Sequence, residues 1–165
     1  MTIEAINALP IDALTESLTR CCGAHNWVDA MVALRPFLDK NDLKNKATQT
    51  WLNMKKTDIL EAFQHHPRIG DIQTLRAKFA NTQEWAGNEQ SGTNRADEGT
   101  LRALKIQNDA YFTKFGYIFI VCATGKSAQE MLDILESRLP NAPEKELKIA
   151  ANEQLKITHI RLEKL

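Results

Sequence analysis

The stretch EGTLRALKIQNDAYFTKF, from Glu98 to Phe115, decides the fold class. Its bulky residues recur at spacings of three and four, which places them on one face of an α-helix. They are Leu101, Leu104, Asn108, Phe112 and Phe115. Gly116 follows, and glycine is the usual residue just beyond the end of a helix. A helix with such a stripe must pack against other elements of the chain.

The same helical periodicity recurs along almost the whole chain. It predicts helices over Pro10–Cys21, Trp27 to just before Pro36, Leu43–Met54, Asp58–Gln64, 72–80, Ser127–Leu139 and Asn141 to the C-terminus. Expected helix caps are Asn26, Thr57, Ser127 and Asn141. Residues 86–95 predict turns. The segment Tyr117–Ala123 is the one strand-like run, and we interpret it as a buried extended segment. The economical prediction is one all-α domain over residues 1–165.

The bulk composition excludes several classes of function. The chain has 165 residues, with 21 basic and 21 acidic side chains. A net charge of zero argues against nucleic-acid and membrane-surface binding, which need a concentrated positive face. No apolar stretch reaches membrane-spanning length, and the first residues do not look like a signal peptide. The three cysteines do not form a disulfide framework, so a reducing, cytoplasmic location is expected.

Two polar motifs indicate acid–base chemistry. His65 and His66 precede Pro67, which ends a helix because its ring cannot donate a backbone hydrogen bond. Glu89 lies between Gly87 and Gly92, which permit an unusual backbone. An imidazole and a carboxylate on neighbouring irregular segments can transfer protons. The alternative is that both are solvated, and the residues alone leave this open.

Polar residues also interrupt two apolar stripes. Asn108 lies within the stripe of its helix, where it either pins a loop or orders catalytic loops. The last helix has a predicted face of Leu147, Ala151, Leu155, Thr158 and Leu162. Arg161 falls close to that face, beside Gln154. Arg161 therefore extends its head to solvent at the rim, or it meets a ligand.

A protein-bound metal is not expected. The four histidines, His25, His65, His66 and His159, lack the spacing of helical metal ligands, and Cys21-Cys22 is not a CxxC pair. Cys122 is expected to be a small core residue, and the tryptophans Trp27, Trp51 and Trp85 are expected in the core or in pocket walls.

Several short motifs occur in one order along nearly the whole chain. They are Trp27, Arg35-Pro36-Phe37, Leu60–Phe63, His66–Gly70, Gly87–Ser91, Asn108–Tyr111, Phe115–Ile120, Gly125–Ser127, Arg138-Leu139 and Glu153…Ile157…Arg161-Leu162. In this set the chain resembles the 2-oxo-4-hydroxy-4-carboxy-5-ureidoimidazoline (OHCU) decarboxylases of purine breakdown.

The resemblance implies an all-α, cofactor-free and generally dimeric enzyme. Such an enzyme releases CO₂ from OHCU and yields (S)-allantoin. The resemblance selects His66 as the acid/base residue and Glu89 as its acidic partner. It implies substrate contacts at Pro67, Ala86, Gln90, Phe119, Ile120, Val121, Cys122, Ala123 and Arg161. Ala86 departs from the family, in which serine is frequent at this position.

Two other functions compete with this one. A helical domain that only docks a partner predicts an exposed apolar groove. A metal-dependent hydrolase of a cyclic ureide would need clustered ligands, and chelation would abolish its activity.

Overall fold

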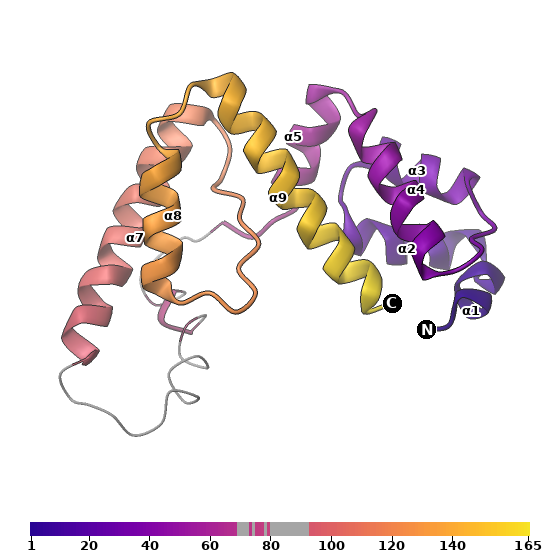
Figure 1. Cartoon of the computed structure of the whole chain (residues 1–165), viewed down its shortest axis with the longest axis horizontal. Coiled ribbons are helices and arrows are strands. Elements are labelled where there is room, and N and C mark those ends of the chain that lie inside the picture. Colours follow the sequence, from indigo (N-terminus) through magenta and orange to yellow (C-terminus); the bar gives the residue numbers. More distant parts are fainter. Residues whose placement is uncertain (69–72, 74, 78, 80–92) are drawn as a thin grey trace. The chain divides into compact units, whose positions relative to one another are not determined.

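The structure, a computed structural model, describes residues 1–68, 73, 75–77, 79 and 93–165, with only the backbone described for 93–97. In these residues every regular element is a helix, which confirms the predicted all-α class. The elements are α1 (Ile3–Ala8), α2 (Ile11–Cys21), α3 (His25–Ala33), α4 (Lys40–Leu52), α5 (Lys56–Gln64), α7 (Thr93–Phe115), α8 (Ala128–Arg138) and α9 (Pro143–Glu163) (Figure 1). Part of the helix predicted over 72–80 is also seen, at Gln73, Leu75–Ala77 and Phe79.

The chain divides into two compact units. The first, which we call the N-terminal unit, comprises Met1–His66, Ile120–Cys122 and Lys148–Leu165. The second, the α7–α8 unit, comprises Pro67–Phe119 and Ala123–Leu147. The single domain expected over residues 1–165 stays a prediction.

The core of the N-terminal unit lies among α2, α3, α4 and α5, with α3 in contact with the other three. Two tryptophans tie this core together. The indole of Trp27 donates to the carbonyl of Ala47 at 3.1 Å, and that of Trp51 donates to Ala151 on α9 at 3.0 Å. A buried indole needs such an acceptor. The predicted core role of these two tryptophans is confirmed, whereas Trp85 lies outside the described residues.

In the α7–α8 unit, α7 and α8 pack side by side and run in the same direction (Figure 1). Thr100 bonds Gln129 at one end of the pair, and Lys114 bonds the carbonyl of Leu139 at the other. Parallel helices need a connection that returns along their length. Residues 117–123 supply it without forming a strand, which agrees with the predicted extended segment.

Gly116 and Gly125 have φ of 80° and 73°, a backbone conformation that favours glycine. The first ends α7 as predicted. The helix begins at Thr93, however, so the turns expected at 93–95 are wrong. The remainder of that expected stretch, 86–92, lies outside the described residues.

Three of the four expected helix caps are wrong, because their side chains bond more distant partners or the helix begins earlier. Ser127 does cap α8, accepting from the amide of Glu130. Asn26 instead donates to Asp58, and Ala24 precedes α3. Lys55 rather than Thr57 precedes α5. Asn141 donates to Glu146, and α9 begins at Pro143.

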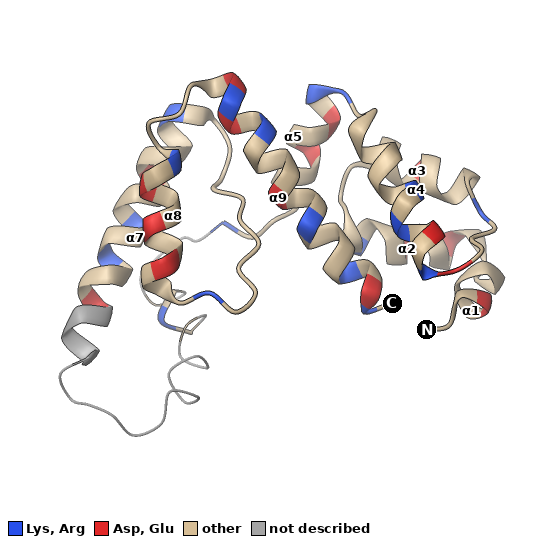
Figure 2. Ribbon diagram, viewed as in Figure 1, with Lys and Arg blue, Asp and Glu red and all other residues tan. Residues whose placement is uncertain are grey.

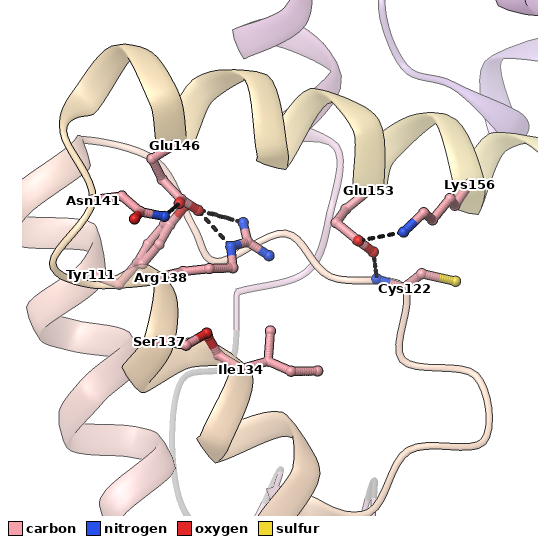
Figure 3. Close-up of polar contacts among 9 residues, drawn as sticks. All are labelled: Tyr111, Cys122, Ile134, Ser137, Arg138, Asn141, Glu146, Glu153 and Lys156. Atoms are coloured by element: carbon pink, nitrogen blue, oxygen red, sulfur yellow. Dashed lines mark hydrogen bonds and ion pairs between the residues drawn. The ribbon is translucent and has the colours of Figure 1, made fainter.

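A buried ion pair joins α7, α8 and α9 in the α7–α8 unit. The carboxylate of Glu146 is 2.6 Å from both Nε and Nη2 of Arg138 (Figure 3). It also accepts from the Tyr111 hydroxyl at 2.6 Å and from Asn141 at 3.0 Å. Burial, together with the hydrogen bond to Glu146, raises the pKa of Tyr111 far above its ordinary value. The phenol therefore stays protonated and can keep donating. Arg138 also lies 4.7 Å from the centre of the Phe119 ring.

Candidate active site

The end of α5 presents the histidine doublet. His65 is the C-cap of this helix, and the amide of His66 still donates to the carbonyl of Phe63 at 3.2 Å. Helical bonding stops there, immediately before Pro67, as the sequence predicts. His65 is exposed and His66 is half-buried. The two neighbours therefore differ in surroundings, a difference that their sequence did not reveal.

An exposed ion pair fastens α5 to the start of α3. Nδ1 of His25 lies 2.8 and 2.9 Å from the two carboxylate oxygens of Glu61, and the amide of His25 donates to the same group at 2.7 Å. The hydrogen bond to Glu61 raises the pKa of His25, and the hydrogen bonds from His25 lower the pKa of Glu61. Protonated His25 contributes stability to the folded protein, and this contribution is lost as the pH rises through the raised pKa of His25. Ionised Glu61 also contributes stability, and this contribution is lost as the pH falls through the lowered pKa of Glu61.

We therefore expect this ion pair to stabilise the α3–α5 contact between the lowered Glu61 pKa and the raised His25 pKa. In an NMR titration, the His25 ring should titrate above its ordinary pKa of 6.5. In Glu61→Gln the same ring should return towards that value. A His25 pKa that is unchanged by this substitution would contradict the contact.

Gly23 leaves room for the ring of His65. A Cβ placed on Gly23 would overlap the Cβ, Cγ and Cδ2 of His65, so a larger residue there must displace the end of α5. We expect Gly23→Ala to lower the free energy of unfolding by about 1–3 kcal/mol, as overpacking does. Gly99 is the matched control, because a Cβ on this helical glycine meets nothing within 4 Å. Gly99→Ala should raise stability by about 0.5–1 kcal/mol through helix propensity. Urea unfolding of both variants tests this, and equal effects would contradict it.

His66 bonds to a buried polar chain on α9. Its Nε2 lies 2.5 Å from Oε1 of Gln154, a residue without solvent exposure. The Gln154 amide nitrogen donates to the Thr158 hydroxyl at 3.2 Å, and that hydroxyl donates to the main-chain carbonyl of Gln154 at 2.9 Å. Thr158 also contacts the Cys22 thiol, whose pKa burial raises to about 11. These groups lie within the N-terminal unit.

A hydrogen bond also connects the extended segment to the turn of α9 that carries Gln154. The amide of Cys122 donates to Oε2 of Glu153 at 2.8 Å, and Lys156 pairs with the other oxygen of this carboxylate (Figure 3). Glu153 and Gln154 are adjacent, so one turn of α9 holds both Cys122 and His66. Cys122 is buried, as expected of a core residue.

Arg161 lies seven residues after Gln154, so the two share a face of α9 about 10 Å apart. Its guanidinium donates to the carbonyls of Arg20 and Cys21 at 3.3 and 3.5 Å. These carbonyls are at the C-terminus of α2, where the helix dipole attracts a cation. Arg161 is half-buried. Because its guanidinium binds these two carbonyls, it has a structural role in this conformation.

The predicted face of α9 is displaced by one residue from the buried one. The fully buried positions are Glu146, Ala150 and Gln154, whereas Leu147, Ala151 and Leu155 are half-buried. Thr158 and Leu162 are buried as expected. The prediction followed hydrophobicity, but this face is built on hydrogen bonds. The roles of Glu153 and Gln154 were missed for that reason.

The other predicted site residues differ in burial, and some of them lie outside the described residues. Phe119 and Ile120 are buried, Val121 and Ala123 are half-buried, and Pro67 is exposed. Ala86, Glu89 and Gln90 lie outside the described residues. Asn108 is half-buried and donates to the carbonyl of Leu104 in its own helix, not to a loop. Among described residues, no group of three or more His, Cys, Asp or Glu side chains is placed to hold a metal ion.

Comparison with known proteins identifies the family of this chain. A family model described as OHCU decarboxylase matches residues 7–163. The chain belongs to the OHCU decarboxylase family. A solved member, the crystal structure of an OHCU decarboxylase in the presence of (S)-allantoin, is 35% identical to it. The match covers 90% of this chain and 96% of that one, with a TM-score of 0.71.

The curated relatives of this chain differ in length. The uric acid degradation bifunctional protein TTL of Arabidopsis thaliana is 35% identical over 88% of this chain, but the match spans only 45% of that protein. The 2-oxo-4-hydroxy-4-carboxy-5-ureidoimidazoline decarboxylase of Halalkalicoccus jeotgali is 24% identical over 100% of this chain and 92% of its own length. This chain therefore spans less than half of the first relative and nearly all of the second.

Proposed function

We propose that this chain decarboxylates OHCU to (S)-allantoin, a step in urate breakdown, with His66 as acid/base residue. The observation that carries the proposal is the match to the OHCU decarboxylase family over residues 7–163. The solved relative crystallised in the presence of (S)-allantoin supports this choice of product. The placement of His66 at a helix end, with one ring nitrogen held by α9, supports its role.

The substrate itself can accept the electrons that decarboxylation releases. OHCU carries a carboxylate and a hydroxyl on one ring carbon, next to a C=N bond. When the C–C bond to the carboxylate breaks, its electron pair moves into that C=N bond, and CO₂ leaves. The resulting enol or enolate is then protonated on one face, at the carbon that bears the ureido group. The protein has to orient the carboxylate, stabilise negative charge and transfer protons.

His66 is the proton-transfer group in this proposal. Imidazole is the side chain whose ordinary pKa is closest to neutrality, so it can both accept and return a proton. Glu89, outside the described residues, is proposed to orient and polarise His66 or the substrate hydroxyl. Gln90 and position 86 are proposed to contact the substrate beside it. With alanine at 86, the serine hydroxyl contact is absent or is replaced by another group.

Backbone amides of the segment from Phe119 to Ala123, together with Pro67 and Arg161, are proposed to bind the ring and ureido groups. Two of these groups already have hydrogen-bond partners that the substrate would have to replace. The Cys122 amide already donates to Glu153, so a substrate oxygen would compete with that carboxylate. Arg161 would leave the carbonyls at the end of α2. Both groups can exchange one acceptor for another without losing a hydrogen bond.

The remaining expectations concern the assembly and its surroundings. A homodimer that acts in the cytoplasm without a cofactor is proposed, and nucleic acid is not proposed as a partner. No helix in the described part of the chain is long and apolar enough to cross a membrane. Basic and acidic side chains alternate along α7 and α9, whereas α8 carries acidic side chains along its length and a basic one only in its last turn (Figure 2).

CO₂ release tests the proposed function. OHCU is generated in situ from urate with urate oxidase and hydroxyisourate hydrolase, and CO₂ is measured with the chain and with buffer alone. The chain should accelerate release by at least about 10⁶-fold, the lower end of enzymatic acceleration. The chain should be equally active before and after dialysis against EDTA. Release at the buffer rate would contradict the function, and loss of activity on dialysis would support a metal-dependent enzyme instead.

A further inference from the structure

We propose that Gln154 is the positioning residue of His66: it holds a proton on Nε2, so that the neutral ring has its basic lone pair on Nδ1. The inference rests on the proposed function and deepens it, because it names the ring atom that exchanges protons with the substrate. Gln154 itself does not touch the reacting atoms in this account.

The contact between His66 and Gln154 is short, and Gln154 is buried. Oε1 of Gln154 lies 2.5 Å from Nε2 of His66, and the Gln154 side chain has no solvent exposure. A buried amide must have hydrogen-bond partners, because leaving one of its groups unpaired costs about 1–3 kcal/mol. Water does not compete for this amide, so its bond to His66 holds the ring in one orientation.

The second support is the orientation of the amide group. Thr158 has one hydroxyl proton, which it donates to the main-chain carbonyl of Gln154 at 2.9 Å. Its oxygen can then only accept from the side-chain nitrogen of Gln154, 3.2 Å away. The amide therefore turns its oxygen towards His66. Since an amide oxygen accepts and never donates, the proton between them belongs to Nε2 of His66.

Proton transfer follows from this arrangement. In the neutral ring the lone pair is on Nδ1, which accepts a proton to give the imidazolium. The bond from Nε2 to Gln154 is present in both forms, so the ring gains and returns the proton without rotating. The nearby Cys22 thiol adds no charge at neutral pH, because burial raises its pKa to about 11. Gln154 is a neutral amide, so its contact orients the ring without adding a charge of its own.

The tautomer can be measured without any turnover. In the full-length protein labelled with ¹⁵N-histidine, two-bond ¹H–¹⁵N correlation spectra report which ring nitrogen carries the proton. With His66→Asn used for assignment, neutral His66 should have a protonated Nε2 and an unprotonated Nδ1. In Gln154→Met, which retains the volume but removes the acceptor, both tautomers should appear. A wild-type ring protonated on Nδ1, or one unchanged in Gln154→Met, would overturn the inference.

Kinetics then separate positioning from packing. Gln154→Met should lower kcat about 10- to 100-fold, as loss of an orienting hydrogen bond does, with a small change in KM. Gln154→Glu retains the acceptor and adds a negative charge that favours the imidazolium. It should therefore shift the pH profile of kcat/KM to higher pH. Gln49→Glu is the matched control, because it makes the same change at an exposed position of α4. Its pH profile should equal that of the wild type.

Failure of the inference and failure of the proposed function are distinguishable. An inactive wild-type chain whose His66 is protonated on Nε2 contradicts the function and supports the tautomer assignment. An active wild-type chain with the same pH profile in Gln154→Glu overturns the inference and leaves the function standing.

Discussion

His66→Ala should lose about 10²–10⁴-fold in kcat for OHCU decarboxylation, the usual contribution of a positioned acid/base group. The substitution removes the imidazole that we propose to carry the proton. It also leaves the Gln154 amide oxygen without its partner, so stability should fall by about 1–3 kcal/mol. The fold should remain intact, as far-UV circular dichroism can show. Steady-state kinetics on enzymatically generated OHCU measure the loss.

The adjacent His65 is the matched control for this prediction. His65 is exposed and lies one residue from His66, so His65→Ala removes an imidazole from the same helix end. We expect it to retain activity within a few-fold of the wild type. If His66→Ala were fully active, or if His65→Ala caused the larger loss, the assignment of the acid/base residue would be wrong.

Glu146→Ala should lower the free energy of unfolding by about 3–5 kcal/mol, the usual effect of breaking a buried ion pair. Arg138 keeps its charge, and only 6% of its side chain is exposed. Without Glu146 this charge has lost its carboxylate, and the Tyr111 hydroxyl and the Asn141 amide lose an acceptor. Guanidinium unfolding, followed by circular dichroism, measures the difference.

An exposed ion pair provides the control for Glu146→Ala. Glu16 and Arg20 form an i,i+4 pair on α2 at 3.5 Å, and their side chains are 72% and 69% exposed. Because water screens such a pair, Glu16→Ala should change stability by less than about 1 kcal/mol. Similar losses in the two variants would mean that burial does not determine the strength of these pairs.

The sequence predicted the fold class and most helices because hydrophobic periodicity is a local signal. Ser127 and Gly116 were correctly interpreted as helix boundaries, since each acts within one turn of chain. Asn26 and Asn141 were not, because the Asn26 side chain bonds Asp58 on α5 and the Asn141 side chain bonds the buried carboxylate of Glu146. A side chain with a tertiary partner gives no local sign of it.

The candidate site was harder to predict for the same reason. His66 was selected over His65 by resemblance to a family, whereas the structure distinguishes them by burial and by the bond to Gln154. The roles of Gln154 and Glu153 were not predicted, because polar residues were not expected to hold the candidate site to α9. Arg161 was left open between rim and ligand, and its bonds to the end of α2 identify a third, structural role.

The handedness of the product tests the central claim most directly. Allantoin formed from OHCU in situ is followed by circular dichroism with wild-type chain, with His66→Ala and with buffer. We predict a rapid signal of (S)-allantoin with the wild type alone, because only a protein-held proton donor adds its proton to one face. Equal, optically inactive allantoin in all three samples would contradict the proposed decarboxylase.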